Sequence, residues 1–242
     1  MMSPGLSMVA LVALASAIGC SLTPADDLAD RRVPQAPPAS SSTPAVAAEP
    51  SPLAARQEAQ ESFDSARVAL VREDYGESAR HLSEAAAFMR SHAAHAEIGA
   101  IAALQGSAKE LEMLAERLTR GETLSVRMLD RVVANANRAE GQHHLTRAAV
   151  AIADYAYGDA GEELLMAVDH LERSALDLRR PNEPEADPAL SDARRLGRSM
   201  VLGGVPSRDE ARRVIRQLEG ELRRLCAIID IEARACAVEA AR

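Results

Sequence analysis

Histidine is the residue type in this chain that is best suited to bind a metal ion or to transfer a proton. Two pairs have a spacing that places both side chains on one face of a helix: Glu140 with His143, and His92 with His95. Each pair offers two ligands to one ion, but a di-metal site built this way needs a second Glu-x-x-His pair, and the sequence holds none. The six histidines are His81, His92, His95, His143, His144 and His170. We expect them to be solvated or capping residues, and we assign no metal ligand.

The chain has three cysteines, Cys20, Cys226 and Cys236. On one continuous helix, Cys226 and Cys236 would lie about 15 Å apart along the axis, which is beyond the reach of a disulfide. Three interpretations are open: the helix breaks near Asp230, both thiols are buried singly, or they bridge two chains. Single burial is the interpretation that we favour, and neither cysteine has the local signature of a catalytic thiol.

Cys20 closes a short apolar stretch at the amino terminus. The run from Leu6 to Ile18 holds 13 apolar or small residues, too few to cross a hydrocarbon core about 30 Å thick as a helix. Its length is typical of the apolar region of a secretory signal. The string Ala17-Ile18-Gly19-Cys20 resembles the lipobox of bacterial lipoproteins. This resemblance implies cleavage before Cys20, a diacylglyceryl group on its thiol and an acylated amino terminus, which together anchor a protein stably.

By the same resemblance, Ser21 after the cysteine implies sorting to the cell outer membrane, with the folded part facing the periplasm. Ala17 stands where such signals usually carry Leu, and residues 1–5 contain no Lys or Arg. Two alternatives therefore stay open: secretion after cleavage by the ordinary signal peptidase, and an uncleaved anchor or a misassigned start.

Composition argues against several classes of function. The formal net charge of −8 does not suit nucleic-acid binding. Aromatic residues make up only 2% of the chain, with no Trp, so the aromatic walls of most small-molecule pockets are lacking. Glycine-rich phosphate loops, Ser-His-Asp arrangements and paired-carboxylate motifs do not occur. We expect that the protein is not an enzyme, that it has no catalytic residue and that it binds no cofactor.

Apolar residues recur with a helical period from residue 51 nearly to the end of the chain. A turn at Asp74-Tyr75-Gly76 separates the first two helices, and Gly121 is a typical residue just past the end of the third. Gly141 either interrupts the fourth helix or lies inside a long one. A capping-box pattern opens the last helix, roughly residues 207 to 238. No segment has the period of two that indicates a strand.

The first hairpin recurs 82 positions later. Tyr75-Gly76-Glu77 corresponds to Tyr157-Gly158-Asp159, and the same shift aligns the apolar residues on both sides of the turn. The aligned pairs are Phe63 and Leu145, Ala66 and Ala148, Val68 and Val150, Leu70 and Ile152, Leu82 and Leu164, Ala86 and Val168, and Met89 and Leu171. We interpret this as an internal duplication, with coincidence between two Ala-rich hairpins as the alternative.

The turn Asp74-Tyr75-Gly76-Glu77, followed by Ala79 and Ala86, distantly resembles a tetratricopeptide hairpin. The repeat distance of 82 differs from the 34 residues of that family. The resemblance therefore implies a helical hairpin and not a peptide-binding groove.

These observations predict an all-α fold, either a helical bundle or a short array of antiparallel helical hairpins with an internal duplication. The expected segments are a signal peptide (1–19), a lipid-anchored, disordered linker rich in Pro, Ala and Ser (20–51), a duplicated hairpin domain (52–180) and a C-terminal helical pair packed on it (187–242). The expected function is a non-enzymatic interaction or scaffold module of the cell envelope. Its protein partners are unknown, and a homo-oligomer is left open. The alternative is a bundle that binds metal or haem through His143, or through His92 and His95.

Overall fold

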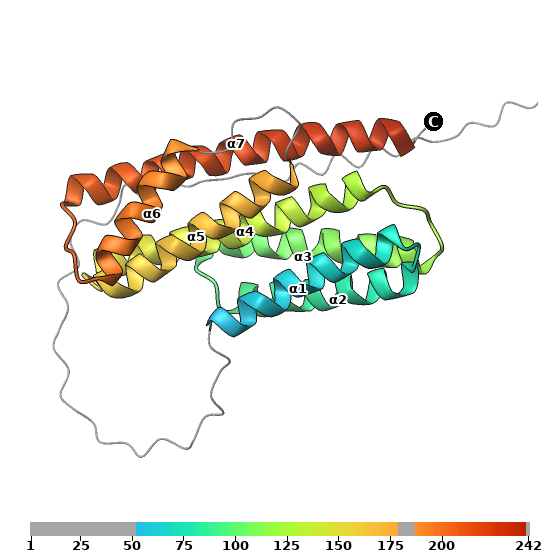
Figure 1. Ribbon diagram of the computed structural model, residues 1–242, viewed down its shortest axis with the longest axis horizontal. Helices are drawn as coiled ribbons and strands as arrows, with labels where there is room; N and C mark the ends of the chain where they lie inside the picture. The colour runs from blue at the N-terminus through green and yellow to red at the C-terminus, as the bar shows by residue number, and fades with distance from the viewer. Residues whose placement is uncertain (1–51, 179–186, 241–242) are drawn as a thin grey trace, which may run out of the picture.

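The computed structural model describes residues 52–178 and 187–240, and within them every regular element is an α-helix. The helices are α1 (Pro52–Val71), α2 (Tyr75–Ala94), α3 (Ile98–Thr119), α4 (Val126–Ala153), α5 (Tyr157–Asp177), α6 (Pro188–Val201) and α7 (Arg208–Ala240) (Figure 1). The predicted all-α bundle is thereby confirmed. The expected signal peptide, Cys20 and the linker lie outside the described residues.

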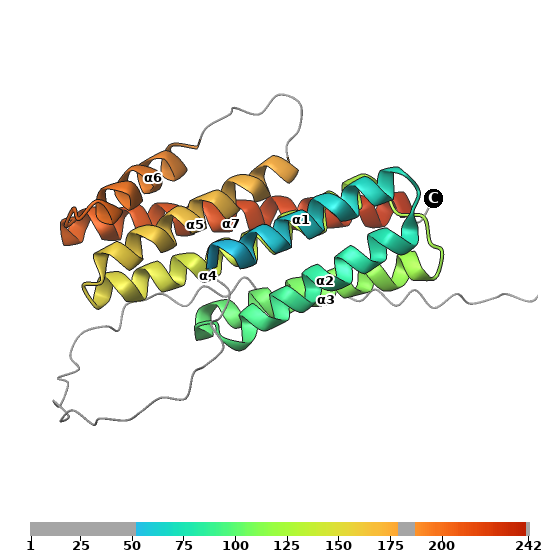
Figure 2. The same ribbon diagram turned by 60° about the horizontal axis from the view of Figure 1, so that its bottom comes forward.

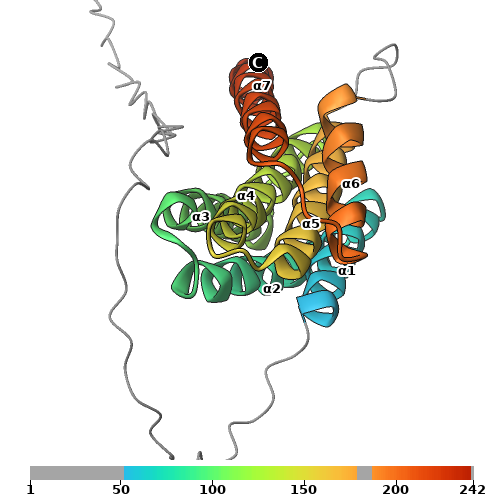
Figure 3. The ribbon, with the colours of Figure 1, turned by 90° about the vertical axis from the view of Figure 1, so that its left-hand side faces the viewer.

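Helix α4 is the centre of the bundle. It packs against α1, α3, α5 and α7, and in the end view of Figure 3 it lies between α3 and α5. Figure 2 shows α6 at the edge opposite α2 and α3. Residues 132–141 of α4 are all buried, so the polar side chains in this stretch must find their partners inside the protein. No described helix is both long and apolar enough to span a membrane.

The two hairpins that the sequence aligns also share one turn geometry. Helices α2 and α5 begin at Tyr75 and Tyr157, 82 positions apart, as predicted. Glu73 and Tyr155, separated by the same distance, adopt positive φ angles of 62° and 60°. In both turns the next amide donates to the carbonyl five residues before it, at 2.9 Å. The turns lie at opposite ends of the bundle (Figure 1), and the backbone geometry of the turn is therefore repeated together with the sequence.

Glycine and cysteine positions resolve the open points of the sequence. Gly121 has a φ of 79° just past α3, as expected, and Gly141 lies inside α4 without interrupting it.

Helix α7 does not break near Asp230. Cys236 is a buried thiol, as expected, whereas Cys226 is half-buried. The interpretation that both thiols are buried is therefore confirmed for Cys236 and wrong for Cys226.

The apolar core has two parts, which meet along α4. The first part joins α1, α2 and α3 to the first half of α4, up to Ala139. The second joins the last part of α4, from Leu145 onward, to α5, α6 and α7. Between these two cores α4 carries Glu140, His143 and His144, all of them buried. A polar layer thus separates the two cores.

Helices α5 and α6 cross at a pair of glycines. A Cβ atom on Gly161 would lie 2.7 Å from the carbonyl oxygen of Gly197 and 2.9 Å from the amide nitrogen of Val201. Both are backbone atoms, so a side chain at this position can be accommodated only if the two helices move apart. Gly106 in α3 differs, because nothing lies within 4 Å of the corresponding Cβ position.

We expect Gly161→Ala to lower the free energy of unfolding by about 1–3 kcal/mol, because the backbone clash outweighs the higher helix propensity of Ala. The matched control Gly106→Ala should raise it by up to about 1 kcal/mol, since only propensity changes there. Denaturant unfolding followed by circular dichroism measures both. Equal stabilisation by the two substitutions would contradict the close crossing.

Candidate metal centre

Four histidines and two glutamates gather in the polar layer between the two cores. Three helices supply them: His92 from α2, Glu140, His143 and His144 from α4, and Glu163 and His170 from α5. Five of the six are buried, and the side chain of His92 is 27% exposed. The cluster is therefore an interior feature that reaches the surface at His92.

Glu140, His144 and His170 each offer one potential ligand atom, and these atoms lie within 4.8 Å of one another. The register of the hairpin explains the convergence, because Glu140 and His170 each lie fifteen residues from Tyr155 in the α4–α5 turn. Gly141 allows the two helices to approach here: a Cβ at this position would lie 2.8 Å from the Leu171 side chain.

Only one of the two carboxylate oxygens of Glu140 has a hydrogen-bond partner among the described residues. Its Oε2 lies 3.0 Å from Nδ1 of His92, whose N–H donates to it. Its Oε1 is buried and has no hydrogen-bond partner among the described residues. A buried carboxylate oxygen without a partner is costly, and a bound cation would remove this cost.

The ring of His144 is held from one side. Its Nδ1 lies 2.7 Å from Oε2 of Glu163, and Arg147 binds the other oxygen of that carboxylate at 2.9 Å. Because an ionised carboxylate only accepts, the proton of the neutral ring is on Nδ1 and the lone pair is on Nε2. A carboxylate that orients a histidine in this way is common behind metal ligands.

His170 is oriented by an amide. Nδ1 of His170 lies 3.3 Å from Oδ1 of Asn137, and Nδ2 of Asn137 donates to Asp177 at 3.2 Å. The donation to Asp177 identifies the amide nitrogen, so Oδ1 accepts from the His170 ring. As in His144, the residue that binds Nδ1 is not one of the three potential ligands, and Nε2 is the nitrogen suited to a metal.

His143 is the electrically neutral neighbour of this group. Burial, together with the nearby His144, His92 and Arg147, lowers the pKa of His143 to about 3. Its Nδ1 is buried and has no hydrogen-bond partner among the described residues. Its ring centroid lies 5.2 Å from that of His144 and 5.9 Å from that of His92. A neutral imidazole is the form that binds metal ions.

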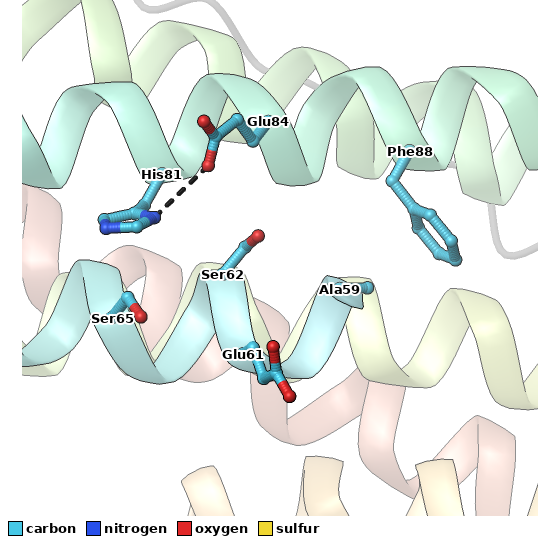
Figure 4. A pocket seen from close by; sticks show the side chains of 7 residues that line it. All are labelled: Ala59, Glu61, Ser62, Ser65, His81, Glu84 and Phe88. Atoms are coloured by element: carbon cyan, nitrogen blue, oxygen red, sulfur yellow. Dashed lines mark ion pairs between the residues drawn. The ribbon is translucent and has the colours of Figure 1, made fainter. Parts of the chain in front are cut away.

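An open groove of about 410 Å³ lies between α1 and α2. Figure 4 shows His81 and Phe88 pointing from α2 toward α1, with Glu84 beside His81 and Glu61 on α1. His81 lies 3.2 Å from Glu84. The ring centroid of Phe88 lies 4.0 Å from that of His92. Phe88 therefore forms part of the groove wall and contacts the polar cluster.

The structure groups the histidines differently from the pairs that the sequence suggested. His92 and His143 both belong to the cluster with Glu140. His95 does not, because it caps the C-terminal end of α2 and is exposed. Sequence reasoning did not select His144 and His170. The signal that would have found them is the antiparallel register around the α4–α5 turn, which sets the positions of α5 opposite those of α4.

No protein-family model matches the chain, and no curated protein or solved structure is significantly similar to it. Assignment of function therefore depends on the chemistry of the residues described above.

The hydrogen bonds that run from His170 through Asn137 reach Asp177, which belongs to a group of ion pairs joining three helices. Arg67 of α1 donates to Asp130 of α4 at 2.7 Å and to Asp177 of α5 at 2.9 Å. Burial nevertheless raises the pKa of Asp177 from 3.8 to about 6, because desolvation of the carboxylate outweighs the attraction of Arg67. The ionised form of Asp177 is thus costly in the folded protein.

The folded-state pKa of Asp177 lies above its unfolded value, so the native state binds the proton more tightly. Its contribution to the free energy of unfolding is largest below about pH 4 and falls by up to about 3 kcal/mol as the pH rises to about 6. We expect Asp177→Asn to stabilise the protein by roughly 1–3 kcal/mol at neutral pH and to change little at about pH 4. Asp64→Asn is the control, because Asp64 also pairs with Arg67 but is exposed, so its carboxylate is not desolvated. Destabilisation by Asp177→Asn at neutral pH would show that the ion pair is net favourable.

Proposed function

We propose that this protein binds a divalent transition-metal ion in the interior of its helical bundle. The observation that carries the proposal is the convergence of Glu140, His144 and His170. The unpartnered Oε1 of Glu140 and the engaged Nδ1 atoms of both histidines support it. The convergence of three atoms on one point suits a single ion better than a haem.

The ligand types favour zinc or a chemically similar ion. Imidazole and carboxylate bind Zn²⁺ at about 2.0–2.2 Å, so ligand atoms around a tetrahedral ion lie about 3.4 Å apart. The three atoms, now within 4.8 Å of one another, would need to draw together by roughly 1 Å. Two histidines and one glutamate leave a fourth position, which water or the neutral His143 would fill.

We expect the purified full-length protein to bind about one Co²⁺ or Zn²⁺ per chain. Glu140→Gln, His144→Gln and His170→Gln should each lower the affinity at least roughly hundredfold, because each removes a ligand and this loss exceeds that of an outer-shell partner. Elemental analysis and Co²⁺ absorption titration measure stoichiometry and affinity, and circular dichroism reports whether each variant is folded.

His95→Gln and His81→Gln are the matched controls, because His81 lies on α2 and His95 caps the C-terminal end of α2, both outside the converging group. They should leave the affinity unchanged. A folded, metal-free wild-type protein that takes up no Co²⁺ or Zn²⁺ would overturn the proposal, and the cluster would then be a hydrogen-bonded polar layer.

We further propose that the bundle is held at the outer membrane, facing the periplasm, by a lipid on Cys20. The support is the string Ala17-Ile18-Gly19-Cys20, which resembles a lipobox, and the stable anchoring that multiple acyl chains provide. The interaction or scaffold role, its envelope partners and the absence of enzymatic activity stay predictions from the sequence.

In a Gram-negative host, the wild-type protein should partition into detergent, and its amino-terminal peptide should begin at a lipid-modified Cys20. Cys20→Ala should leave the protein in the aqueous phase, whereas the control Cys236→Ala should stay anchored. Mass spectrometry of the peptides also shows whether the sulfur of Cys226 is joined to another cysteine. A disulfide between Cys226 and Cys20 would contradict the anchor, because a sulfur that carries diacylglycerol cannot form a disulfide.

A further inference from the structure

The groove between α1 and α2 has the chemistry of a place where divalent cations collect. Glu61 and Glu84, one from each helix, are exposed in it, and Glu84 pairs with Arg80 and lies 3.2 Å from His81. Figure 4 shows Glu84 and His81 side by side on α2, Glu61 on α1, and Phe88 further along α2. Carboxylates that line a cleft raise the local concentration of cations and speed their arrival.

A continuous series of rings leads from this groove to the buried centre. Phe88 forms part of the groove wall, and its ring centroid lies 4.0 Å from that of His92. His92 is partly exposed and binds Glu140 through Nδ1 at 3.0 Å.

Beyond His92 the imidazoles continue inward across two more helices. Successive ring centroids are 5.9 Å apart from His92 to His143, 5.2 Å from His143 to His144, and 5.4 Å from His144 to His170. Each imidazole is a potential transient ligand for a metal ion. The series ends at two of the three converging residues.

We propose that the α1–α2 groove is the entrance through which the metal ion reaches the centre, and that His92 transfers it to Glu140. This inference rests on the proposed metal binding. Glu61, Glu84 and His81 gather the hydrated divalent cation, and Phe88 separates the groove from the interior. His92 then binds the ion through the lone pair of Nε2 while Nδ1–H still donates to Oε2 of Glu140, and the ion passes to the converging group.

Passage residues and ligands leave different kinetic signatures. A residue that only helps the ion to pass lowers the barrier in both directions, so its loss slows uptake and release by the same factor and leaves the affinity unchanged. Loss of a ligand weakens the affinity itself.

The test measures Co²⁺ uptake by stopped-flow absorption and Co²⁺ release to excess chelator, using the full-length protein in detergent. The double variant Glu61→Gln/Glu84→Gln should slow both rates roughly 5–10-fold, with less than a twofold change in affinity. His92→Gln retains a donor for Glu140 but not the imidazole, and it should also slow both rates. Glu97→Gln and His95→Gln, exposed and outside the groove, should change neither rate.

Unchanged rates in the groove variants, together with normal stoichiometric binding, would overturn the entrance and leave the metal centre standing. A weaker affinity in His92→Gln, with release faster and not slower, would identify His92 as a ligand. A wild-type protein that binds no Co²⁺ would overturn the metal centre, and the entrance would fall with it.

Discussion

The burial of the polar stretch of α4 is the constraint on which the rest of the structure depends. Its side chains cannot reach water, so each neighbouring helix must supply a partner. Asn135 donates to Glu110 of α3, Asn137 donates to Asp177 of α5, and Glu140 accepts from His92 of α2. These bonds fix the rotation and height of three helices relative to α4, because an apolar interface alone would tolerate small displacements.

The small residues of the bundle determine how closely this polar stretch is enclosed. Gly141 brings α5 onto α4 beside the converging group, and the glycine pair of α5 and α6 draws α6 onto the same unit. Close packing at these points keeps water out of the layer and strengthens every charge interaction within it. The same exclusion of water makes an oxygen without a partner expensive, which is why Glu140 stands out from the many other carboxylates of this acidic chain.

The helical elements could be predicted because their signals are local. The aligned apolar residues Phe63, Ala66 and Leu70 of the first hairpin are buried, and the repeat of 82 positions located the second hairpin turn to the residue. The candidate metal centre depends instead on which helices meet, and no single helix contains that information. His95 was grouped with His92 because the two are three residues apart, but α2 ends between them. The connection from Glu140 to His170 required the register of a folded hairpin.

The division of the core has a consequence for how the protein opens. Each half has its own apolar interior, and α4 is the one helix that contributes buried residues to both. Native-state hydrogen exchange in such a molecule resolves into cooperative units, here two, with the amides in the middle of α4 exchanging only when both units open. An ion bound at the boundary would merge the two units into one. Occupancy of the centre would then be visible as protection of amides far from any ligand.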